Sequence, residues 1–356
     1  MAIIGWADAP RVPYDDLNAL ITRMFVAAGL SGADASVAAD SLLIADVRGV
    51  ETHGVQRMKF YLTGLGNGRV DAKAALTVDR ERPGTVAFNG NHGLGLVMAT
   101  HAMERVIEKA SENGICLGTL RYSSHYGIAG RYALMAAERD MCGMSMTNSS
   151  ALVVPTGAKR AALGTNPIAF AAPTNGDPFC LDMATSTVAV GKIEVARRLG
   201  LPIPAGWSVD AEGIPTSDVN AHSALTPLGG EYLTGGHKGY GLGAMVEIFC
   251  SQLATNPWSD ELARSHGEGD AGANGQMFMA WRVDAFRDVQ DFKDALSTMC
   301  LELRAMEPLD PAMPVLVPGD PEMVATRINM EQGVPIRKPV FDELRALAEG
   351  LGAAWL

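Results

Sequence analysis

Thr52, His53 and Arg57 are the first residues whose types and spacing could do chemistry on a small acid. An arginine guanidinium is a planar fork that binds a carboxylate through two parallel hydrogen bonds. A histidine can donate to an adjacent oxygen or exchange a proton with it near neutral pH. If residues 52–62 are helical, His53 and Arg57 share one face and Tyr61 extends it by a turn. The pattern favours a carboxylate clamp beside an acid/base group, although a solvated helix face would have the same spacing.

His125 is a second candidate acid/base group. Two serines precede it and Gly127 follows it, between an expected strand at 115–120 and an expected helix at 129–139. Functional side chains favour loops of this kind, held by a rigid scaffold. Two polar loops, at 147–150 and 164–167, follow within the next forty-odd residues. The stretch therefore offers an acid/base group and a cradle for a polar ligand; a purely structural histidine is the alternative.

Two further polar positions stand out. Asp182 comes at the end of an apolar strand, where an unpaired buried carboxylate would be costly. It could orient a histidine or a cofactor amide, or it could cap the helix that follows. His237 and Lys238 lie among glycines at 235–239. A cation flanked by glycines favours contact with an anion such as phosphate, with a simple loop as the alternative.

Several strong motifs are absent from the sequence. It has no phosphate-binding P-loop, no G-x-S-x-G nucleophile turn, no H-E-x-x-H and no paired-cysteine metal site, so we predict no metal. The glycines at 93–95 and 239–243 imitate a dinucleotide fingerprint with the wrong spacing. Those near 239 could admit a phosphate at a helix N-terminus, or serve only close helix packing.

The composition sets limits on the class of protein. The chain has 356 residues, 47% of them hydrophobic, enough for two domains or one large one. A net charge of −11 without a basic stripe argues against nucleic acid. No apolar run is long enough to span a membrane, and residues 1–12 do not resemble a signal peptide. Five cysteines without a C-x-x-C pair suggest buried free thiols and a reducing, cytoplasmic setting.

Apolar periodicity and turn residues predict the elements that must position these side chains. Helices are expected at 13–28, 32–47, 52–62, 94–113, 129–139, 193–199, 240–253, 289–305 and 340–350. Short strands are expected at 76–79, 85–88, 115–120, 142–147, 168–172, 179–183 and 276–283. Residues 202–233 should be mostly loop, 259–275 mobile, and 308–321 extended. A helical N-terminal part thus precedes a strand-rich middle.

Taken together, the motifs closely resemble the malate/L-lactate dehydrogenase family, which also contains sulfolactate, ureidoglycolate and diketogulonate oxidoreductases. The matching text runs from residue 48 to residue 241. It comprises Arg48-Gly49, Thr52-His53-Gly54-Val55, Arg57, Ser124-His125-Tyr126-Gly127, Thr147-Asn148-Ser149, Pro155-Thr156-Gly157, Leu163-Gly164-Thr165-Asn166-Pro167, Asp182-Met183-Ala184-Thr185-Ser186 and Gly236-His237-Lys238-Gly239-Tyr240-Gly241.

The resemblance implies an NAD- or NADP-dependent enzyme that interconverts a small anionic 2-hydroxy acid and its 2-oxo acid. It implies an α/β, non-Rossmann, sulfolactate-dehydrogenase-like fold whose central mixed sheet is largely antiparallel. Residues 1–120 and 285–356 would form a helical substrate and dimerisation domain, and residues 121–284 the cofactor domain. The family also implies a cytoplasmic homodimer or larger assembly, with the substrate near the subunit interface.

The resemblance also assigns roles to single residues. His125 matches the proton acceptor, while His53 and Arg57 match a substrate-contacting pair; the two histidines could exchange roles. Thr52 and, from its spacing, Tyr61 are expected to contact the substrate as well. The cofactor-contacting set is Asn148, Ser149, Asp182, Met183, Ala184, His237, Lys238, Pro318, Gly319 and Asp320. Thr52 stands where the family more often has serine, and its extra methyl could narrow the pocket.

The sequence leaves several alternatives open. The same apparatus could reduce a cyclic imino acid or a diketo sugar acid, although the imine-reducing branch looks different around His125. A non-catalytic binder of an anionic metabolite would belong to another class. The choice between NAD and NADP depends on residues around the ribose 2′ position that the sequence does not identify.

Overall fold

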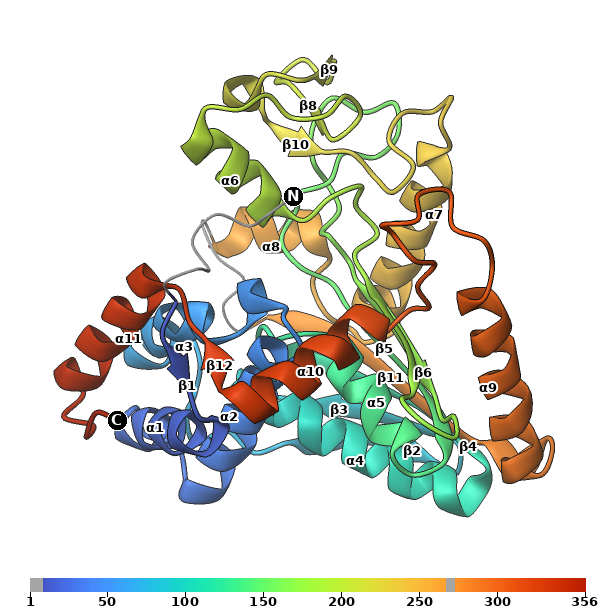
Figure 1. Ribbon diagram of the computed structural model, residues 1–356. Helices are drawn as coiled ribbons and strands as arrows, with labels where there is room; N and C mark the ends of the chain where they lie inside the picture. The colour runs from blue at the N-terminus through green and yellow to red at the C-terminus, as the bar shows by residue number, and fades with distance from the viewer. Residues whose placement is uncertain (1–8, 267–272) are drawn as a thin grey trace.

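The computed structural model describes residues 9–266 and 273–356 of the chain (Figure 1). Its helices are α1 (Tyr14–Ala27), α2 (Gly32–Val47), α3 (Met58–Gly66), α4 (Gly95–Asn113), α5 (Gly130–Ala137), α6 (Val190–Leu199), α7 (Gly236–Glu247), α8 (Ser259–His266), α9 (Val289–Arg304), α10 (Asp320–Gln332) and α11 (Lys338–Gly350). Short 3-10 turns lie at Glu51–His53, Val55–Arg57, Val219–Ala221 and Val283–Ala285, and the π-helical turn η4 at Ile248–Gln252 continues α7.

The strands form one large sheet and two small ones. The strands are β1 (Arg11–Val12), β2 (Thr77–Arg82), β3 (Thr85–Asn89), β4 (Ile115–Ser123), β5 (Met141–Thr147), β6 (Ile168–Ala172), β7 (Phe179–Met183), β8 (Ser208–Val209), β9 (Pro215–Thr216), β10 (Ala224–Leu225), β11 (Asn274–Arg282) and β12 (Val334–Pro335). Seven of them pair in the order β2-β3-β4-β11-β5-β6-β7. Only β3 and β4 run parallel within this sheet, so the expected mixed, largely antiparallel sheet is confirmed.

Helices α4 and α5 cover one face of this sheet (Figure 1). The apolar side of α4 is buried, and α4 ends where Gly114 adopts a φ of 84°, which a glycine accommodates without strain. Small residues bring α5 close to β5, because a Cβ at Gly143 would lie 2.4 Å from the carbonyl oxygen of Ala133. The side of the sheet that α5 covers is thus tightly packed, and the loop before α5 carries His125.

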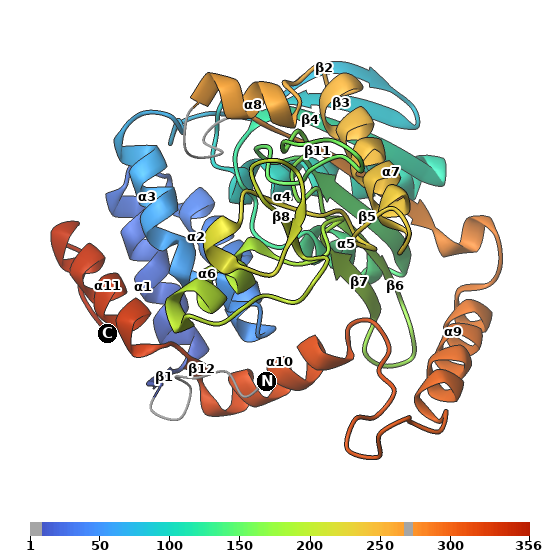
Figure 2. The same cartoon turned by 90° about the horizontal axis from the view of Figure 1, so that it is seen from above.

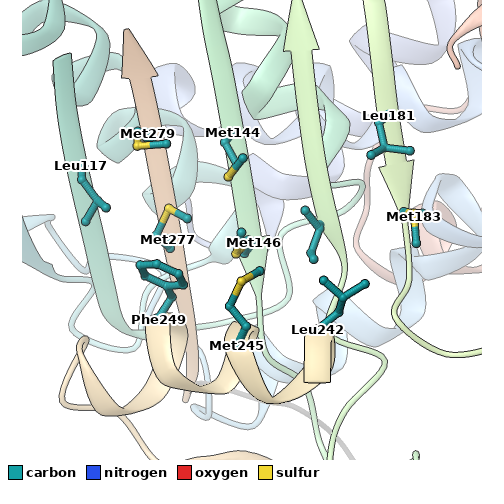
Figure 3. Close-up of a pocket in the computed structure, with 11 residues that line it drawn as sticks. Leu117, Met144, Met146, Leu181, Met183, Leu242, Met245, Phe249, Met277 and Met279 are labelled. Atoms are coloured by element: carbon teal, nitrogen blue, oxygen red, sulfur yellow. The ribbon is translucent and has the colours of Figure 1, made fainter. Parts of the chain in front are cut away.

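The other face of the sheet carries an apolar groove of about 390 Å³ (Figure 3). Side chains at alternate strand positions point to the same face. The groove therefore collects Met144 and Met146 from β5 and Met277 and Met279 from β11. Leu242, Met245 and Phe249, from α7 and the π-helical turn, line one side of it. No titratable side chain lines this groove, so it is not an acid/base site.

A helical unit packs beside the sheet. Figures 1 and 2 show α1, α2, α3 and α11 grouped together, with α10 extending past α2. The expected cap of α2 is confirmed, since Ser31 Oγ accepts a hydrogen bond from Asp34 N at 3.1 Å. Helix α9 lies at the outer edge of the molecule in both views, where Phe292 and Leu296 pack against a small core cluster that includes Cys142. A small sheet of β10, β8 and β9 lies near α6.

Three expectations about elements were wrong. Residues 52–62 are not one helix, because Gly54 separates two 3-10 turns before α3 begins at Met58. Residues 259–266 form α8 and residues 274–275 begin β11, while residues 267–272 of the expected mobile loop lie outside the described residues. Helix α10 was not expected, although Pro321 at its start suits a first helical turn.

The sheet also crosses the domain limit expected at residue 120. Strands β2, β3 and β4 come from residues 77–123 and join the same sheet as β5, β6, β7 and β11. One apolar core runs through both parts, from Leu17 in α1 to Phe278 in β11. The five cysteines are free and buried, as predicted. No helix among residues 9–266 and 273–356 is long and apolar enough to cross a bilayer.

Candidate active site

His53 and His125 come from different parts of the chain and stack on one another. Their ring centroids are 5.6 Å apart with an interplanar angle of 22°. Phe60 meets the His125 ring edge-on, with centroids 5.9 Å apart. Both histidines are only partly buried. The fold therefore brings together the two acid/base candidates that the sequence placed more than seventy residues apart.

The Nδ1 atom of His125 is held by two partners. Tyr61 Oη lies 2.6 Å from it, and Gly127 N donates to it at 3.3 Å. Tyr61 is only 2% exposed, so its hydroxyl faces the imidazole inside the protein. Because a phenol can donate or accept, Tyr61 can keep Nδ1 partnered whether or not that nitrogen carries a proton. Nε2 is thereby the nitrogen left for an incoming oxygen.

Close packing against α4 sets the position of the His125 loop. Ser124 Oγ accepts from Gly95 N at 2.7 Å, and Ser124 O accepts from Gln276 Nε2 at 2.9 Å. A Cβ at Gly95 would lie 2.1 Å from Ser124 O and 2.4 Å from His125 O, so only glycine allows α4 to start there. Rigid neighbours from α4 and β11 thus fix the backbone that carries the imidazole.

Thr52 and Arg57, which were expected to bind the substrate with His53, lie around His53 in a turn and not on a helix face. Thr52 Oγ1 lies 2.9 Å from His53 Nδ1, and Arg57 Nε donates to Thr52 O at 2.8 Å. The expected shared helical face of His53 and Arg57 was wrong, because Gly54 breaks the helix between them. Their proximity arises from this turn instead. Arg57 is exposed, which leaves the rest of its guanidinium for an anion.

Burial and positive charge keep both imidazoles neutral. Loss of solvent, followed by the charge of Arg57, lowers the pKa of His53 to about 4. Loss of solvent, then His53 and Arg57, holds the pKa of His125 well below its ordinary range. A carboxylate bound to Arg57 would offset one of these causes. An anionic ligand would therefore raise the proton affinity of the histidines beside it.

Asp182 and Met183 point to opposite faces of the sheet. Asp182 Oδ2 accepts from Gly130 N, the first residue of α5, at 2.7 Å. The carboxyl therefore caps α5 and not the helix that follows it in sequence. Met183 faces the apolar groove on the other side (Figure 3). Ala184 follows directly after β7 and is partly exposed.

The late loop at Pro318–Asp320 lies beside the same strand. Cys180 N donates to Pro318 O at 3.1 Å, and a Cβ at Gly319 would lie 3.2 Å from Cys180 N. Asp320 forms an ion pair with Arg304 across 2.7 Å. The 318–320 segment therefore lies against Cys180 near the start of β7, whereas residues 182–184 lie at the end of that strand, and the Asp320 carboxylate already has a partner.

Asn148 is completely buried and its amide is used inside the protein. Its Oδ1 accepts from Gly275 N at 2.9 Å, and its Nδ2 donates to Pro257 O at 3.0 Å. Ser149 Oγ accepts from Thr165 N at 3.2 Å, which joins the two polar loops that the sequence singled out. Any contribution of Asn148 to ligand binding would therefore be made through the shape of its loop.

Glu247 holds these loops together. Its carboxylate accepts from Asn166 Nδ2 at 2.7 Å, from Asn148 Nδ2 at 3.4 Å and from both the Oγ and the backbone N of Ser259. Glu247 is 6% exposed, and every one of these neighbours is a neutral donor. The carboxylate therefore draws three loops onto the end of α7.

His237 and Lys238 lie in the first turn of α7, and both are exposed. The ring of His237 lies 5.0 Å from that of Tyr232. Two N–H groups at the start of this twelve-residue helix already have acceptors, because Gly236 N donates to Glu231 O at 2.8 Å and Lys238 N donates to Gly235 O at 2.9 Å. The partial positive charge of the helix start and the Lys238 ammonium group fit a phosphate better than an apolar ligand.

Two residues important to this geometry were not predicted from the sequence. Asp46 lies in α2 beneath the His53 turn, and its only signal was a charge inside the apolar run of that helix. Glu247 was a lone acid inside the apolar helix expected at 240–253, which gave the same weak signal. Among residues 9–266 and 273–356, no group of three or more acidic, histidine or cysteine side chains could hold a metal ion.

Comparison with known proteins gives the same family along nearly the whole chain. The model of the malate/L-lactate dehydrogenase family matches residues 12–345. The malate dehydrogenase of Pyrococcus abyssi is 41% identical over 350 residues, which is 97% of this chain and 96% of the relative. The malate/(S)-sulfolactate dehydrogenase of Methanothermus fervidus is 33% identical, covering 95% of this chain and 97% of the relative.

The solved structures agree with the sequence relatives. The malate dehydrogenase of Pyrococcus horikoshii OT3 superimposes with a TM-score of 0.90 at 39% identity, covering 99% of this chain and 98% of the other. Similarity of this extent includes both the helical unit and the sheet. The chain therefore belongs to the malate/L-lactate dehydrogenase family and is a dehydrogenase that acts on CH–OH groups.

Proposed function

We propose that this enzyme transfers a hydride between NAD or NADP and a small 2-hydroxy acid, such as malate, lactate or sulfolactate, giving the 2-oxo acid or the reverse. The observation that carries the proposal is the His53–His125 stack, whose ring centroids lie 5.6 Å apart, beside an arginine with a free guanidinium face. A 2-hydroxy acid presents a carboxylate next to the carbon that reacts. An arginine next to an acid/base group matches those two features.

Arg57 binds the substrate carboxylate in this account, and His125 handles the proton at Nε2. In the oxidation direction, Nε2 takes the hydroxyl proton in the tautomer whose Nδ1 is protonated and donates to Tyr61 Oη, 2.6 Å away. The Gly127 N–H can bond to Nδ1 only in the other tautomer. In reduction, the same nitrogen returns the proton to the carbonyl oxygen. His53 orients that oxygen from the adjacent ring. Charge on Arg57 is offset once the carboxylate binds, which helps His125 to hold a proton during turnover.

The nicotinamide supplies hydride chemistry at C2 of the substrate when it is bound. Exposed Lys238 and His237 at the start of α7 would hold its phosphates, and the neighbouring 148–149, 182–184 and 318–320 segments would shape the rest of the cofactor site. Cofactor binding by this set, without a glycine-rich Rossmann fingerprint, is part of the proposal.

A homodimer or larger assembly is also part of the proposal. The apolar groove on the open side of the sheet and the exposed apolar residues of α9, such as Met299 and Leu301, support it. Exposed apolar area of this kind is typical of surfaces that another subunit covers. Sedimentation analysis should give at least twice the mass of 37.6 kDa, and a monomer at micromolar concentration would contradict the proposal.

A substrate panel tests the proposed reaction. Reduced NAD and reduced NADP are each mixed with oxaloacetate, pyruvate, sulfopyruvate and a cyclic 2-imino acid, and the loss of nicotinamide absorbance is followed. We expect at least one 2-oxo acid to be reduced, and the methyl ester of its C1 carboxylate to react far more slowly because Arg57 loses its partner. Consumption of the imino acid alone would favour the imine reductase, and no reaction with any acid would favour a binding protein.

A further inference from the structure

Asp46 is a buried carboxyl group that the proposed reaction does not use. It lies in the last turn of α2 and is 7% exposed. Its Oδ2 accepts one hydrogen bond, from Val55 N at 2.8 Å. Among residues 9–266 and 273–356, the charged group that affects its pKa is Glu51, another carboxylate, and no cation offsets its burial. An isolated buried carboxyl is costly, so a sequence that only needed to fill this space could do so with an apolar side chain.

The carboxyl group of Asp46 lies directly against Gly54. A Cβ added at Gly54 would lie 2.1 Å from each of Cγ, Oδ1 and Oδ2 of Asp46. Gly54 has a φ of −94°, outside the left-handed region, so the backbone angle itself does not require glycine. Glycine is needed here because the carboxyl occupies the place of a side chain. The two residues therefore form a closely fitted contact.

This contact lies at the junction of the two turns that carry the site. His53 ends the first 3-10 turn and Val55 begins the second, which ends at Arg57. Arg57 N donates to Gly54 O at 2.8 Å, so the arginine is tied to the same peptide. We propose that Asp46 is a positioning residue that fixes His53 relative to Arg57 by holding the Gly54–Val55 peptide from beneath. This inference rests on the substrate-contacting roles proposed above for those two side chains.

The same turn is held from its other side by ordinary ionic contacts. Glu51 pairs with Arg337 across 2.9 Å, and Arg337 also donates to Gln56 at 2.8 Å. Asn329 of α10 donates to the backbone oxygen of Asp46 at 3.3 Å. Burial raises the pKa of the Asp46 carboxyl to about 8, with Glu51 adding to the rise and the Val55 N–H opposing it. The carboxyl therefore acts as a neutral group near neutral pH.

Four variants test this role: Asp46→Ala, Asp46→Asn, Gly54→Ala, and Asp46→Ala combined with Gly54→Ala. Asp46→Ala should raise the KM of the 2-oxo acid by about tenfold and speed exchange of the Val55 amide, because the amide loses its acceptor. Asp46→Asn should stay within about threefold, because asparagine has the shape of the neutral acid and can still accept from Val55. Gly54→Ala should impair KM and kcat, and the double variant should recover part of that loss, because the added methyl enters the vacated space.

The pH profile separates positioning from simple packing. Wild-type kcat/KM should fall as pH rises past about 8, when Asp46 becomes charged against Glu51, and Asp46→Asn should remove that fall. Asp40→Asn, in the same helix but bonded to Tyr14 and Asn18, is the matched control and should leave both KM and the profile unchanged.

The proposal is overturned if Asp46→Ala keeps the wild-type KM and kcat, or if Asp46→Asn keeps the alkaline fall. If Asp46→Ala does not fold, Asp46→Asn and Gly54→Ala decide the matter. A wild-type enzyme that reacts with no 2-oxo acid would instead refute the proposed function, while exchange of the Val55 amide would still report on the contact itself.

Discussion

The histidine pair and the Glu247 cluster are both rich in polar atoms, but they use those atoms differently. At His53 and His125, one nitrogen of each ring has a protein partner, and the rings keep some exposure. Around Glu247, the amides of Asn148 and Asn166 and the hydroxyl of Ser259 are buried and bonded to the carboxylate. The histidine pair therefore has ring nitrogens left to bond to a ligand, whereas most polar atoms of the Glu247 cluster already have partners within the protein.

The difference separates groups that meet the substrate from groups that shape the site. A buried network in which the donors have acceptors is rigid, and removing its centre leaves several of them unsatisfied. A half-exposed imidazole with one free nitrogen can change its protonation state during turnover. Substitutions in the Glu247 cluster should therefore mainly lower the stability of the fold, and substitutions of the two histidines should mainly lower the turnover rate.

The largest effect on stability is expected from Glu247→Ala. The substitution leaves the donors of Ser259 and Asn166 without their carboxylate, at a cost of about 3 kcal/mol or more. Thermal unfolding should therefore shift down by several degrees, and nicotinamide dinucleotide binding should weaken as the 148 and 165 loops loosen. Glu302→Ala, at an exposed position of α9, is the control. An unchanged melting temperature in Glu247→Ala would remove the distinction between the two regions.

A smaller effect, confined to substrate binding, is expected from Arg57→Lys. Lysine keeps the charge but loses the planar fork, so the KM of the 2-oxo acid should rise by about tenfold or more. The melting temperature should stay nearly constant, because Arg57 is exposed. Steady-state kinetics with the best substrate of the panel provide the measurement. A wild-type KM would mean that another cation binds the carboxylate.

The smallest effect is the pH dependence of stability that His53 contributes. Its pKa falls from the ordinary 6.5 to about 4 on folding, so the folded protein binds this proton less readily than the unfolded chain. Stability should therefore be lost as pH falls from 6.5 towards 4. His53→Asn should make that fall shallower in a calorimetric pH series. The wild type and His53→Asn both contain Asp46, so its titration does not contribute to the difference between their stabilities. If the free energy of unfolding changes with pH in the same way in both, the prediction is contradicted.

The sequence predicted the elements better than it predicted their junctions. Apolar periodicity was enough for α1, α2, α4 and most strands of the sheet, because burial of one face determines those patterns. It failed at residues 52–62, where the carboxyl of Asp46 favours a break at Gly54 over a continuous helix. A contact between a side chain and the backbone eight to nine positions further on is not visible in a helical pattern.

The candidate site was predicted by residue type more than by geometry. His53, His125 and Arg57 do lie together, but Tyr61, for which a substrate contact was predicted, has His125 as its partner in the structure. Asn148 matched a family segment, yet its amide is bonded to Gly275, Pro257 and Glu247. Which polar atom faces a ligand depends on long-range contacts that a linear pattern does not contain.

The kinetics of His125→Asn test the central claim most directly. If His125 moves the substrate proton, the variant should lose about 100- to 10,000-fold in kcat with the best 2-oxo acid of the panel. Its dissociation constant for the nicotinamide dinucleotide, measured by fluorescence titration, should stay close to that of the wild type. A variant that turns over at nearly the wild-type rate would show that His125 is not the proton carrier and would contradict the account.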